Sequence, residues 1–225
     1  MRSRAQKRPE ILRAAAIVFA EVGYHAATTA EIAAAAGMTP GNIYYHIQSK
    51  EQLLFDVLMD AMRFGLGIIQ SVRKAYRRSP ARQLFHAIYE TMVAACQRVH
   101  PGMLLFFFTR EHRTALTPEH WRRYVAARDK YEQHFRDMLR EGIAKGDFQE
   151  TDIVLEARLI LGAIQWIHVW FRPEGPLSAQ EVALWHAKRL VGPLLRDQSF
   201  LSTLEGEVTS EAPTSADLSG IGTRS

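Results

Sequence analysis

The sequence predicts an all-α protein. From residue 49 onward no stretch shows the strand-like alternation of polar and apolar residues. Apolar residues instead recur at helical spacing, and Pro, Gly, Ser or Thr stand at the breaks between these runs. Of the 225 residues, 47% are hydrophobic and 23% are charged, as in soluble globular proteins. This length is enough for one large or two modest domains.

The first two helices are expected before residue 38. Residues 9–22 place apolar side chains on one helical stripe, and Gly23 follows at a position where glycine ends helices. Thr28 is expected to cap the second helix, with Glu31 three residues later in capping-box position. This second helix is short and rich in alanine, and it should end at Gly37.

The third helix follows after a tight turn. Thr39 is its expected cap, Pro40 takes the first helical position, and residues 41–47 continue it. Two short helices behind a longer one form a helix-turn-helix pattern. An ordinary three-helix piece of an all-α domain is the alternative. Ser49 should then cap the next helix.

The remainder of the chain is expected to be helical up to a polar tail. The predicted helices cover residues 50–77, 80–98, 102–115, 118–145, 152–171 and 178–196. The tail is rich in Ser, Thr, Gly and Glu and has little to bury, so we expect it to be disordered. The predicted domains are therefore 1–55 (DNA binding), 56–197 (effector binding and dimerisation) and 198–225 (disordered tail).

Charge is distributed unevenly along the chain. The formal net charge is +4, but the predicted tail carries four acids against one base. The tail is therefore −3 and the rest of the chain +7. The first 50 residues contain six bases and three acids. A basic N-terminal segment indicates a polyanionic partner.

The sequence lacks the motifs that are typical of several classes of enzymes and metal-binding proteins. Cys96 is the only cysteine, which excludes an intramolecular disulfide and a multi-cysteine zinc site. There is no H-E-x-x-H, no Gly-rich phosphate loop and no G-x-S-x-G elbow. The longest strongly apolar run, residues 103–108, is far shorter than the roughly 20 residues of a membrane span. We expect no catalysis, no metal, no cofactor, no membrane partner and a cytoplasmic location.

The stretch GMTPGNIYYHIQSKEQLL, residues 37–54, resembles the DNA-binding domain of TetR-family transcriptional regulators. The shared features are the Thr-Thr start of the second helix, an Ile-Ala step followed by Ala-Gly, the Thr-x-Gly opening of the third, and Tyr-x-His before x-Ser-Lys-Glu. The family usually has Phe where this chain has Ile47. That position faces the core, so the change alters packing volume more than chemistry.

The resemblance implies a set of residues that contact DNA. Tyr44 would contact phosphate, Tyr45 and His46 would reach bases or backbone, and Lys50 would pair with a phosphate. Thr28 and Thr29 lie at a helix N-terminus, where free N–H groups favour phosphate. A plain surface histidine and a merely packed tyrosine are the alternatives at 46 and 44. The full predicted DNA-binding set is Thr28, Thr29, Thr39, Pro40, Gly41, Asn42, Tyr44, Tyr45, His46 and Lys50.

A second stretch, WIHVWFRPEGPLSAQEV at residues 166–182, resembles a subgroup of TetR-type repressors. That subgroup controls steroid and fatty-acid breakdown and responds to acyl-coenzyme A thioesters. Apolar walls with a few arginines suit such a ligand, because the arginine fork binds phosphate. The bland alternative is that the aromatic residues form core and the arginines face water. The predicted effector-binding residues are Phe106, Phe107, Arg110, Tyr124, Arg128, Tyr131, Trp166, Trp170 and Arg172.

Dimerisation is expected through residues 152–196, again by resemblance. One recognition helix reads few base pairs, and a symmetric dimer presents two half-sites. Gly162 would let a partner helix come near. A buried intrachain core is the alternative for this apolar helix pair. The side chains predicted to face the partner are Ile160, Leu161, Ile164 and Ile167 on the first helix and Val182, Trp185, Leu190 and Leu194 on the second.

These inferences predict a ligand-responsive DNA-binding regulator. It would repress from a palindromic double-stranded operator as a homodimer and be released by a small molecule, such as an acyl-CoA thioester of lipid or steroid breakdown. One alternative is a regulator of a drug-efflux gene that responds to diverse apolar compounds. Another is a non-specific DNA-binding protein, although the modest net charge argues against it.

Overall fold

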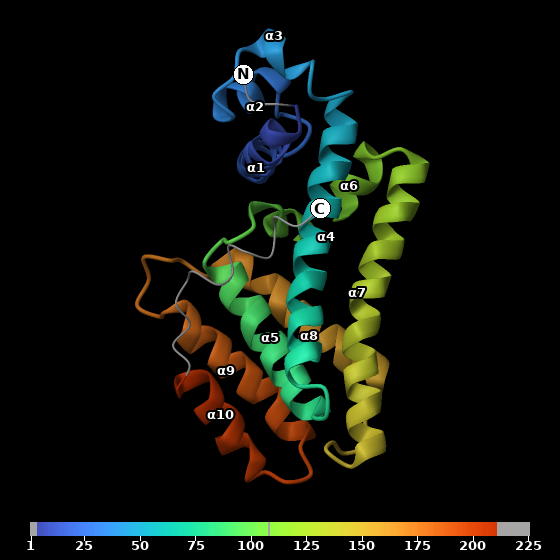
Figure 1. The fold of residues 1–225 in the computed structure, drawn as a ribbon, viewed down its shortest axis with the longest axis vertical. Helices are drawn as coiled ribbons and strands as arrows, with labels where there is room; N and C mark the ends of the chain where they lie inside the picture. Colours follow the sequence, from blue (N-terminus) through green and yellow to red (C-terminus); the bar gives the residue numbers. More distant parts are fainter. Residues whose placement is uncertain (1–3, 108, 211–225) are drawn as a thin grey trace. The chain divides into compact units, whose positions relative to one another are not determined.

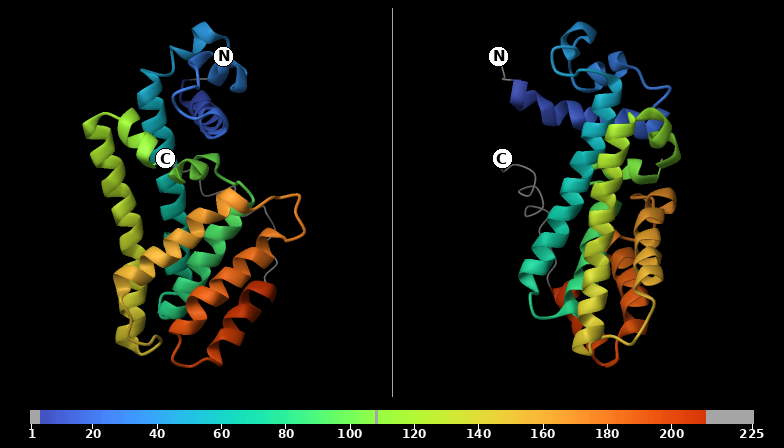
Figure 2. Two further views of the ribbon diagram at one scale, coloured as in Figure 1. Left: turned by 180° about the vertical axis from the view of Figure 1, so that it is seen from behind. Right: turned by 90° about the vertical axis from the view of Figure 1, so that its right-hand side faces the viewer.

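The computed structural model describes residues 4–107 and 109–210 of the chain. Within these ranges the regular structure is helical, with one isolated β-bridge between Phe148 and Leu195 and no strand (Figures 1 and 2). The all-α prediction is confirmed. The chain divides into two compact units, which are described separately. Unit 1 comprises Met1–Arg63 and His100–Asp129, and unit 2 comprises Phe64–Val99 and Lys130–Ser225.

Unit 1 is built on a supporting helix. Its elements are α1 (Arg4–Val22), α2 (Thr29–Ala35), α3 (Pro40–Ile43), the 3-10 helix η1 (Pro101–Phe107), α6 (Thr109–Ala115), and the first parts of α4 (Lys50–Ala75) and α7 (Pro118–Lys145). Helix α1 packs against α2 and η1, and α2 packs against α3. The apolar stripe of α1, including Ile11, Ala15 and Phe19, is buried. The helix starts at Arg4, five residues before the predicted start.

Two glycines end the first two helices as predicted. Gly23 has φ +79° and Gly37 has φ +64°, values that side chains with a Cβ rarely adopt. Thr28 forms the predicted capping box with Glu31, in which each side chain bonds the backbone N–H of the other residue. The turn between α2 and α3 is therefore fixed at both ends.

Helix α3 is shorter than the prediction of a helix through residue 47. Regular α-helix ends at Ile43, and the chain continues as a tight turn. The backbone N–H groups of Asn42, Tyr45 and His46 each bond a carbonyl three residues earlier, at 2.8–3.3 Å. Glycine, aromatic and β-branched residues follow Pro40, and all of these favour a regular helix less than alanine does.

Unit 2 is organised around a buried helix. It contains the end of α4, α5 (Pro80–Cys96), the end of α7, α8 (Ile153–Trp170), α9 (Ala179–Val191), the 3-10 helix η2 (Gly192–Leu194) and α10 (Phe200–Ser210). Helix α5 packs against both α8 and α9 (Figure 1), and all but two of its 17 residues are buried. Side chains on every face of α5 are thus removed from water, which explains its apolar composition.

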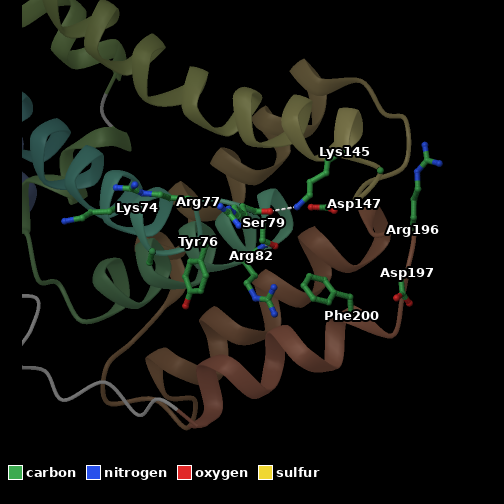
Figure 3. A pocket seen from close by; sticks show the side chains of 13 residues that line it. Lys74, Tyr76, Arg77, Ser79, Arg82, Lys145, Asp147, Arg196, Asp197 and Phe200 are labelled. Atoms are coloured by element: carbon green, nitrogen blue, oxygen red, sulfur yellow. Dashed lines mark hydrogen bonds between the residues drawn. The ribbon is translucent and has the colours of Figure 1, made fainter.

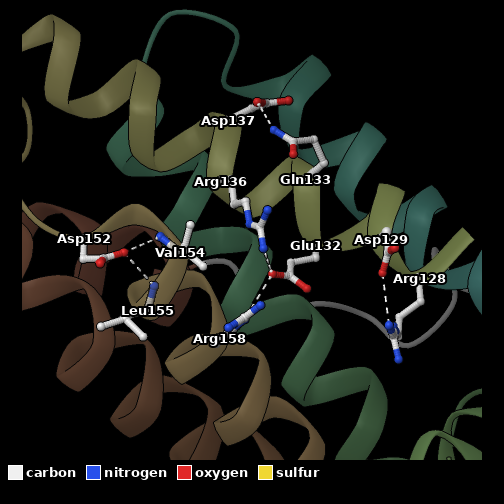
Figure 4. A network of polar contacts seen from close by, with 10 residues as sticks. All are labelled: Arg128, Asp129, Glu132, Gln133, Arg136, Asp137, Asp152, Val154, Leu155 and Arg158. Carbon is white, nitrogen blue, oxygen red and sulfur yellow. Dashed lines mark hydrogen bonds and ion pairs between the residues drawn. The ribbon is translucent and has the colours of Figure 1, made fainter. Parts of the chain in front are cut away.

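Polar contacts join α7 and α8 within unit 2 (Figure 4). Glu132 pairs with Arg136 on its own helix and with Arg158 of α8, where the N–O distance is 3.8 Å. Asp152 caps α8 by accepting hydrogen bonds from the N–H groups of Val154 and Leu155 at 2.9 and 3.0 Å. These contacts fix the start of α8.

The predicted disorder from residue 198 is wrong for Phe200–Ser210, which form α10. Leu204 and Val208 lie one turn apart and are buried, and α10 packs on α5 and α9. Glu207 accepts from Arg82 at 2.7 Å and lies 3.0 Å from the His86 ring. The prediction rested on the average composition of residues 198–225, which does not reveal the short amphipathic segment within them. Residues 211–225 lie outside the described residues.

The predicted domain boundary after residue 55 falls inside α4. This helix runs without interruption from Lys50 to Ala75, so no linker marks the end of the N-terminal unit. Residues 100–129 also belong to unit 1, although the prediction placed them in the C-terminal domain. Their side chains contribute contacts to the loop between α1 and α2, as shown below.

Candidate nucleic-acid interface

A continuous exposed surface surrounds α3. We call it the α3 face, and it consists of Thr39, Pro40, Gly41, Asn42, Tyr44 and Tyr45. Tyr44 is 63% exposed and Tyr45 is 75% exposed, which is unusual for large aromatic residues. Ile43 and Ile47 point the other way and are buried. The helix therefore presents hydrogen-bonding rings outward and attaches to its unit through two isoleucines.

Two features of the α3 face suit close contact with a large partner. A Cβ built on Gly41 would have no neighbour within 4 Å, so the backbone there is open to approach. The hydroxyl of Tyr44 shares a 2.8 Å hydrogen bond with the hydroxyl of Thr29, which ties the ring to α2. This contact orients Tyr44 and leaves most of its ring accessible.

Thr28 is used inside unit 1. Its backbone N–H and its hydroxyl each donate to Oε2 of Glu31 at 2.8 Å. The backbone hydrogen bond is the main cause that lowers the pKa of Glu31, so the carboxylate stays charged at the start of α2. A carboxylate in this place competes with any external anion, so Thr28 serves as a helix cap.

Lys50 does not point outward as a free phosphate ligand. Its ammonium donates to the backbone carbonyls of Tyr24, His25 and Ala27 at 2.9, 3.3 and 2.8 Å. It also lies 4.6 Å from the centre of the Tyr24 ring. A lysine has three N–H donors, and all three are directed at the loop between α1 and α2. The prediction that Lys50 pairs with phosphate is therefore corrected.

The same loop is bonded by a carboxylate that sequence reasoning missed. Oε1 of Glu111, in α6, accepts from the backbone N–H groups of Tyr24 at 2.9 Å and His25 at 3.4 Å. Lys50 thus donates to the carbonyls of this loop, and Glu111 accepts from its N–H groups. The two charged residues are 61 positions apart, and no local sequence pattern connects them. We call them the loop clamp.

His46 is only partly available to a partner. The residue is half-buried, and its Nδ1 is buried with no hydrogen-bond partner among the described residues. It lies between the two exposed tyrosines and the buried Ile47. Its ring is therefore less accessible than the α3 face on either side.

The predicted effector residues are divided between the two units. Tyr124 belongs to unit 1 and Tyr131 to unit 2; both are buried, and burial raises the pKa of each to about 12. Trp166 and Trp170 are 57% and 40% exposed, so they are not core residues.

The predicted arginines are also occupied or exposed. Arg172 donates to the carbonyls of Val169 and Phe171 at the end of α8, and Arg128 pairs with Asp129 next to it. Arg110 is exposed. The side chains of Phe106 and Phe107 lie outside what the structure describes. The shared aromatic and arginine pocket therefore stays a prediction.

Unit 2 contains neutral polar groups that the sequence did not single out. Burial, followed by the positive charge of Arg98, lowers the pKa of His168 in α8 to about 4. Burial also lowers the pKa of His134 in α7. Gln83 in α5 is 3% exposed and donates to the Tyr76 carbonyl at 2.9 Å. Uncharged, half-buried imidazoles can both donate and accept hydrogen bonds at neutral pH.

Helix α8 is apolar on two faces. By length and composition it could cross a membrane, but one of its faces lies in the core of unit 2. Ile160, Ile164 and Ile167 are on that buried face. The prediction that they face a partner is wrong, and the alternative of an intrachain core holds for them, as it does for Val182 and Leu194.

The opposite face of α8 carries large exposed apolar residues. We call it the α8 stripe, and it consists of Leu155, Leu159, Gly162, Trp166 and Val169. These positions follow each other by three or four residues, so they lie along one side of the helix. A Cβ on Gly162 would meet nothing within 4 Å. Trp185 of α9 is also 57% exposed, as the prediction of a partner-facing residue requires.

Comparisons with known proteins agree across most of the chain. Residues 11–57 match the model of bacterial regulatory proteins of the tetR family, and residues 77–193 match that of the tetracyclin repressor-like C-terminal domain. The transcriptional repressor KstR2 of Mycolicibacterium smegmatis is 30% identical over 197 residues, covering 86% of this chain and 93% of that protein. Both resemblances expected from the sequence are thereby confirmed.

Solved structures give the same result. The structure of KstR2 of Mycobacterium tuberculosis, described as a ketosteroid transcriptional regulator, is 26% identical with a TM-score of 0.75, covering 88% of this chain and 97% of that one. The crystal structure of AibR in complex with isovaleryl coenzyme A and operator DNA is 27% identical with a TM-score of 0.74. It covers 84% of this chain and all of the other.

Proposed function

Because the chain belongs to the TetR family of bacterial transcriptional regulators, we propose that it represses genes of lipid or steroid breakdown and is released from DNA by an acyl-CoA thioester. The observation that carries the DNA-binding part is the α3 face. It places six accessible residues of a helix-turn-helix on one side and two buried isoleucines on the other.

In this proposal the α3 face enters the major groove of the operator. Asn42 and Tyr45 are exposed and carry groups that can bond base edges. Tyr44, oriented by Thr29, would donate its hydroxyl to a backbone phosphate. Contacts to phosphate fix the register of the protein on the duplex, and contacts to bases provide the sequence preference.

A homodimer would read two half-sites of a palindromic operator. The α8 stripe supports this arrangement, because large apolar side chains along one helix face need a covering surface. The open space at Gly162 allows close approach of a second helix. Helix α9 would contribute Trp185 to the same interface.

The effector proposal rests on the related structures and on the interior of unit 2. The AibR structure contains a short branched acyl-CoA together with operator DNA. Unit 2 of this chain has an apolar interior with neutral His168 and His134 available for hydrogen bonding. A ligand releases DNA only to the extent that it prefers the form that cannot bind the operator. Shifting a two-state equilibrium from 1:99 to 99:1 requires a preference of about 10⁴-fold.

The test is a gel mobility-shift assay on an operator selected from genomic DNA fragments. Acyl-CoA thioesters with branched, straight-chain and steroid-ring acyl groups are compared with free CoA and with a lipophilic cationic drug. Release by one thioester class, with no effect of free CoA, supports the proposal. Release by the drug with no response to any thioester would replace it with the efflux alternative.

Dimerisation has its own test. Trp166→Lys places a charge in the middle of the α8 stripe, and sedimentation velocity should then show a monomer. Gln70→Lys is the matched control, because Gln70 is an exposed polar residue of α4. A dimer that survives Trp166→Lys would show that another surface forms the interface.

A further inference from the structure

Unit 2 contains a pocket of about 740 Å³ that the proposed function does not use (Figure 3). We call it the basic pocket. Its walls come from the end of α4 and the following loop, the start of α5, the end of α7 and the segment that leads into α10. The lining residues are Lys74, Ala75, Tyr76, Arg77, Arg78, Ser79, Arg82, Lys145, Gly146, Asp147, Arg196, Asp197 and Phe200.

The lining is strongly positive. It contains six Lys or Arg residues and two Asp residues, which gives a net charge of +4. Asp197 accepts from the N–H and the hydroxyl of Ser199, and these bonds lower its pKa. Oδ2 of Asp147 accepts from the backbone N–H of Ala81 at 3.5 Å. Both carboxylates thus accept from backbone N–H groups, and within the described residues neither forms an ion pair with a base of the pocket.

Three of the bases have no acceptor for their side chains among the described residues. Lys74, Arg77 and Arg78 make no side-chain hydrogen bond or ion pair within residues 4–107 and 109–210. The dipole of α4 accounts for a base in its last turn, such as Lys74. It does not account for bases brought to the same pocket from three other segments. Like charges gathered in one place repel each other unless an anion lies between them.

Arg82 is the most informative residue of the pocket. It lies in the first turn of α5, where the helix dipole disfavours a cation. Its Nε donates to Glu207 at 2.7 Å. Its guanidinium lies 4.9 Å from the centre of the Phe200 ring, and Figure 3 shows both side chains. These two contacts fix the plane of the guanidinium. The four Nη hydrogens keep no acceptor in the described residues, which leaves one edge of the fork for an oxygen anion.

We propose that the basic pocket binds a small molecule that carries two or more phosphate groups. Arg82 provides an oriented fork, and the exposed side chains of Arg77, Arg78 and Lys74 provide further positive charge. A single phosphate would fill little of a 740 Å³ pocket, whereas ligand sites typically measure about 300–1,000 Å³. Tyr76 and Phe200 offer aromatic surface for an attached organic group. This inference does not depend on the proposed DNA binding, and CoA, which carries a diphosphate, belongs to the same ligand class as the proposed effector.

The experiment is isothermal titration of the full-length protein with inorganic pyrophosphate, ADP and free CoA at constant ionic strength. Saturable binding of one pyrophosphate per chain is the expected result. Arg77→Ala/Arg78→Ala should weaken it at least about tenfold, which corresponds to about 1.4 kcal/mol. Both side chains are exposed and have no partner among the described residues, so the variant should fold normally.

A matched variant removes two charges elsewhere. Arg113→Ala/Lys130→Ala changes two other exposed bases and should leave the affinity within about twofold. Tighter binding of ADP or CoA than of pyrophosphate would identify an organic phosphate ester as the ligand class, and equal binding would identify the diphosphate group alone. An equal loss of pyrophosphate affinity in the two double variants would overturn the proposal. So would the absence of pyrophosphate binding. Displacement of pyrophosphate by operator DNA to the same extent with and without Arg77 and Arg78 would also overturn it.

Discussion

Replacing Lys50 with methionine separates two roles for this residue. Lys50→Met keeps an unbranched apolar stem of similar length and removes the ammonium. If the loop clamp is correct, three carbonyls of the loop between α1 and α2 lose their donor. Hydrogen bonds to charged groups contribute about 1.5–3 kcal/mol each. Water reaches part of this site, and the bond to His25 is long, so we expect a total loss of about 2–3 kcal/mol.

That loss should lower the midpoint of thermal unfolding by about 5–10 °C. The measurements are urea and thermal unfolding of the full-length protein, together with operator affinity between 50 and 200 mM KCl. Lys7→Met is the control, because within the described residues the ammonium of Lys7 forms only a half-exposed ion pair with Glu10 at 3.3 Å. Its expected effect on stability is below about 0.5 kcal/mol.

A phosphate contact would give the opposite pattern. Stability would stay unchanged, and the slope of log K against log salt would fall by about 0.9 for each protomer. Observing that pattern for Lys50→Met would refute the loop clamp. A stability loss with an unchanged salt slope would show that Lys50 acts on DNA only through the shape of the loop.

The remaining predictions concern the α3 face, its buried side and a histidine of α8. Tyr44→Ala should weaken operator binding by about 1–2 kcal/mol in a fluorescence anisotropy titration. The free energy of unfolding in urea should change by less than about 0.5 kcal/mol, because the ring is 63% exposed. Unfolding of this variant would mean that the outer face of α3 has been misassigned. Ile47→Phe should preserve the circular dichroism spectrum and the operator affinity, while overpacking lowers the free energy of unfolding by about 1–2 kcal/mol. A loss of DNA binding without a loss of stability would show that residue 47 does not act only through the core. In the folded protein, burial lowers the pKa of His168 to about 4 from an ordinary value near 6.5. As the pH falls, the unfolded chain therefore binds a proton at this histidine before the folded chain does. The free energy of unfolding should decrease between about pH 6.5 and pH 4 for this reason. His168→Leu should reduce this slope by up to about 1.4 kcal/mol per pH unit in urea unfolding at several pH values, and an unchanged slope would assign the acid sensitivity to other groups.

The helix-turn-helix could be predicted closely because its determinants are local. Gly23, Gly37, Thr28 with Glu31 and Pro40 each act within four residues of their own position, and the structure places them as expected. The family resemblance reinforced the same segment. The length of α3 was the exception, since a short run of unfavourable residues ended the regular helix four positions early.

The site predictions failed where contacts connect distant segments. Glu111 reaches the loop between α1 and α2 from α6, and nothing near it in the sequence indicates that contact. Lys50 was assigned to phosphate because lysines at this place suggest an external anion, whereas three carbonyls of its own unit surround it. For α8 the periodicity identified an apolar helix correctly. It could not distinguish the buried face from the exposed one, since both are apolar.

The two apolar faces of α8 also affect how the protein behaves before it assembles. A newly folded chain would present the α8 stripe to water, where it could attach to any other apolar surface. Pairing with a second copy removes that hazard, so the yield of usable protein would depend on the rate at which two chains meet. At low expression, the concentration of unpaired chain would then limit the fraction of operator that is occupied. The affinity of the dimer for DNA would matter less.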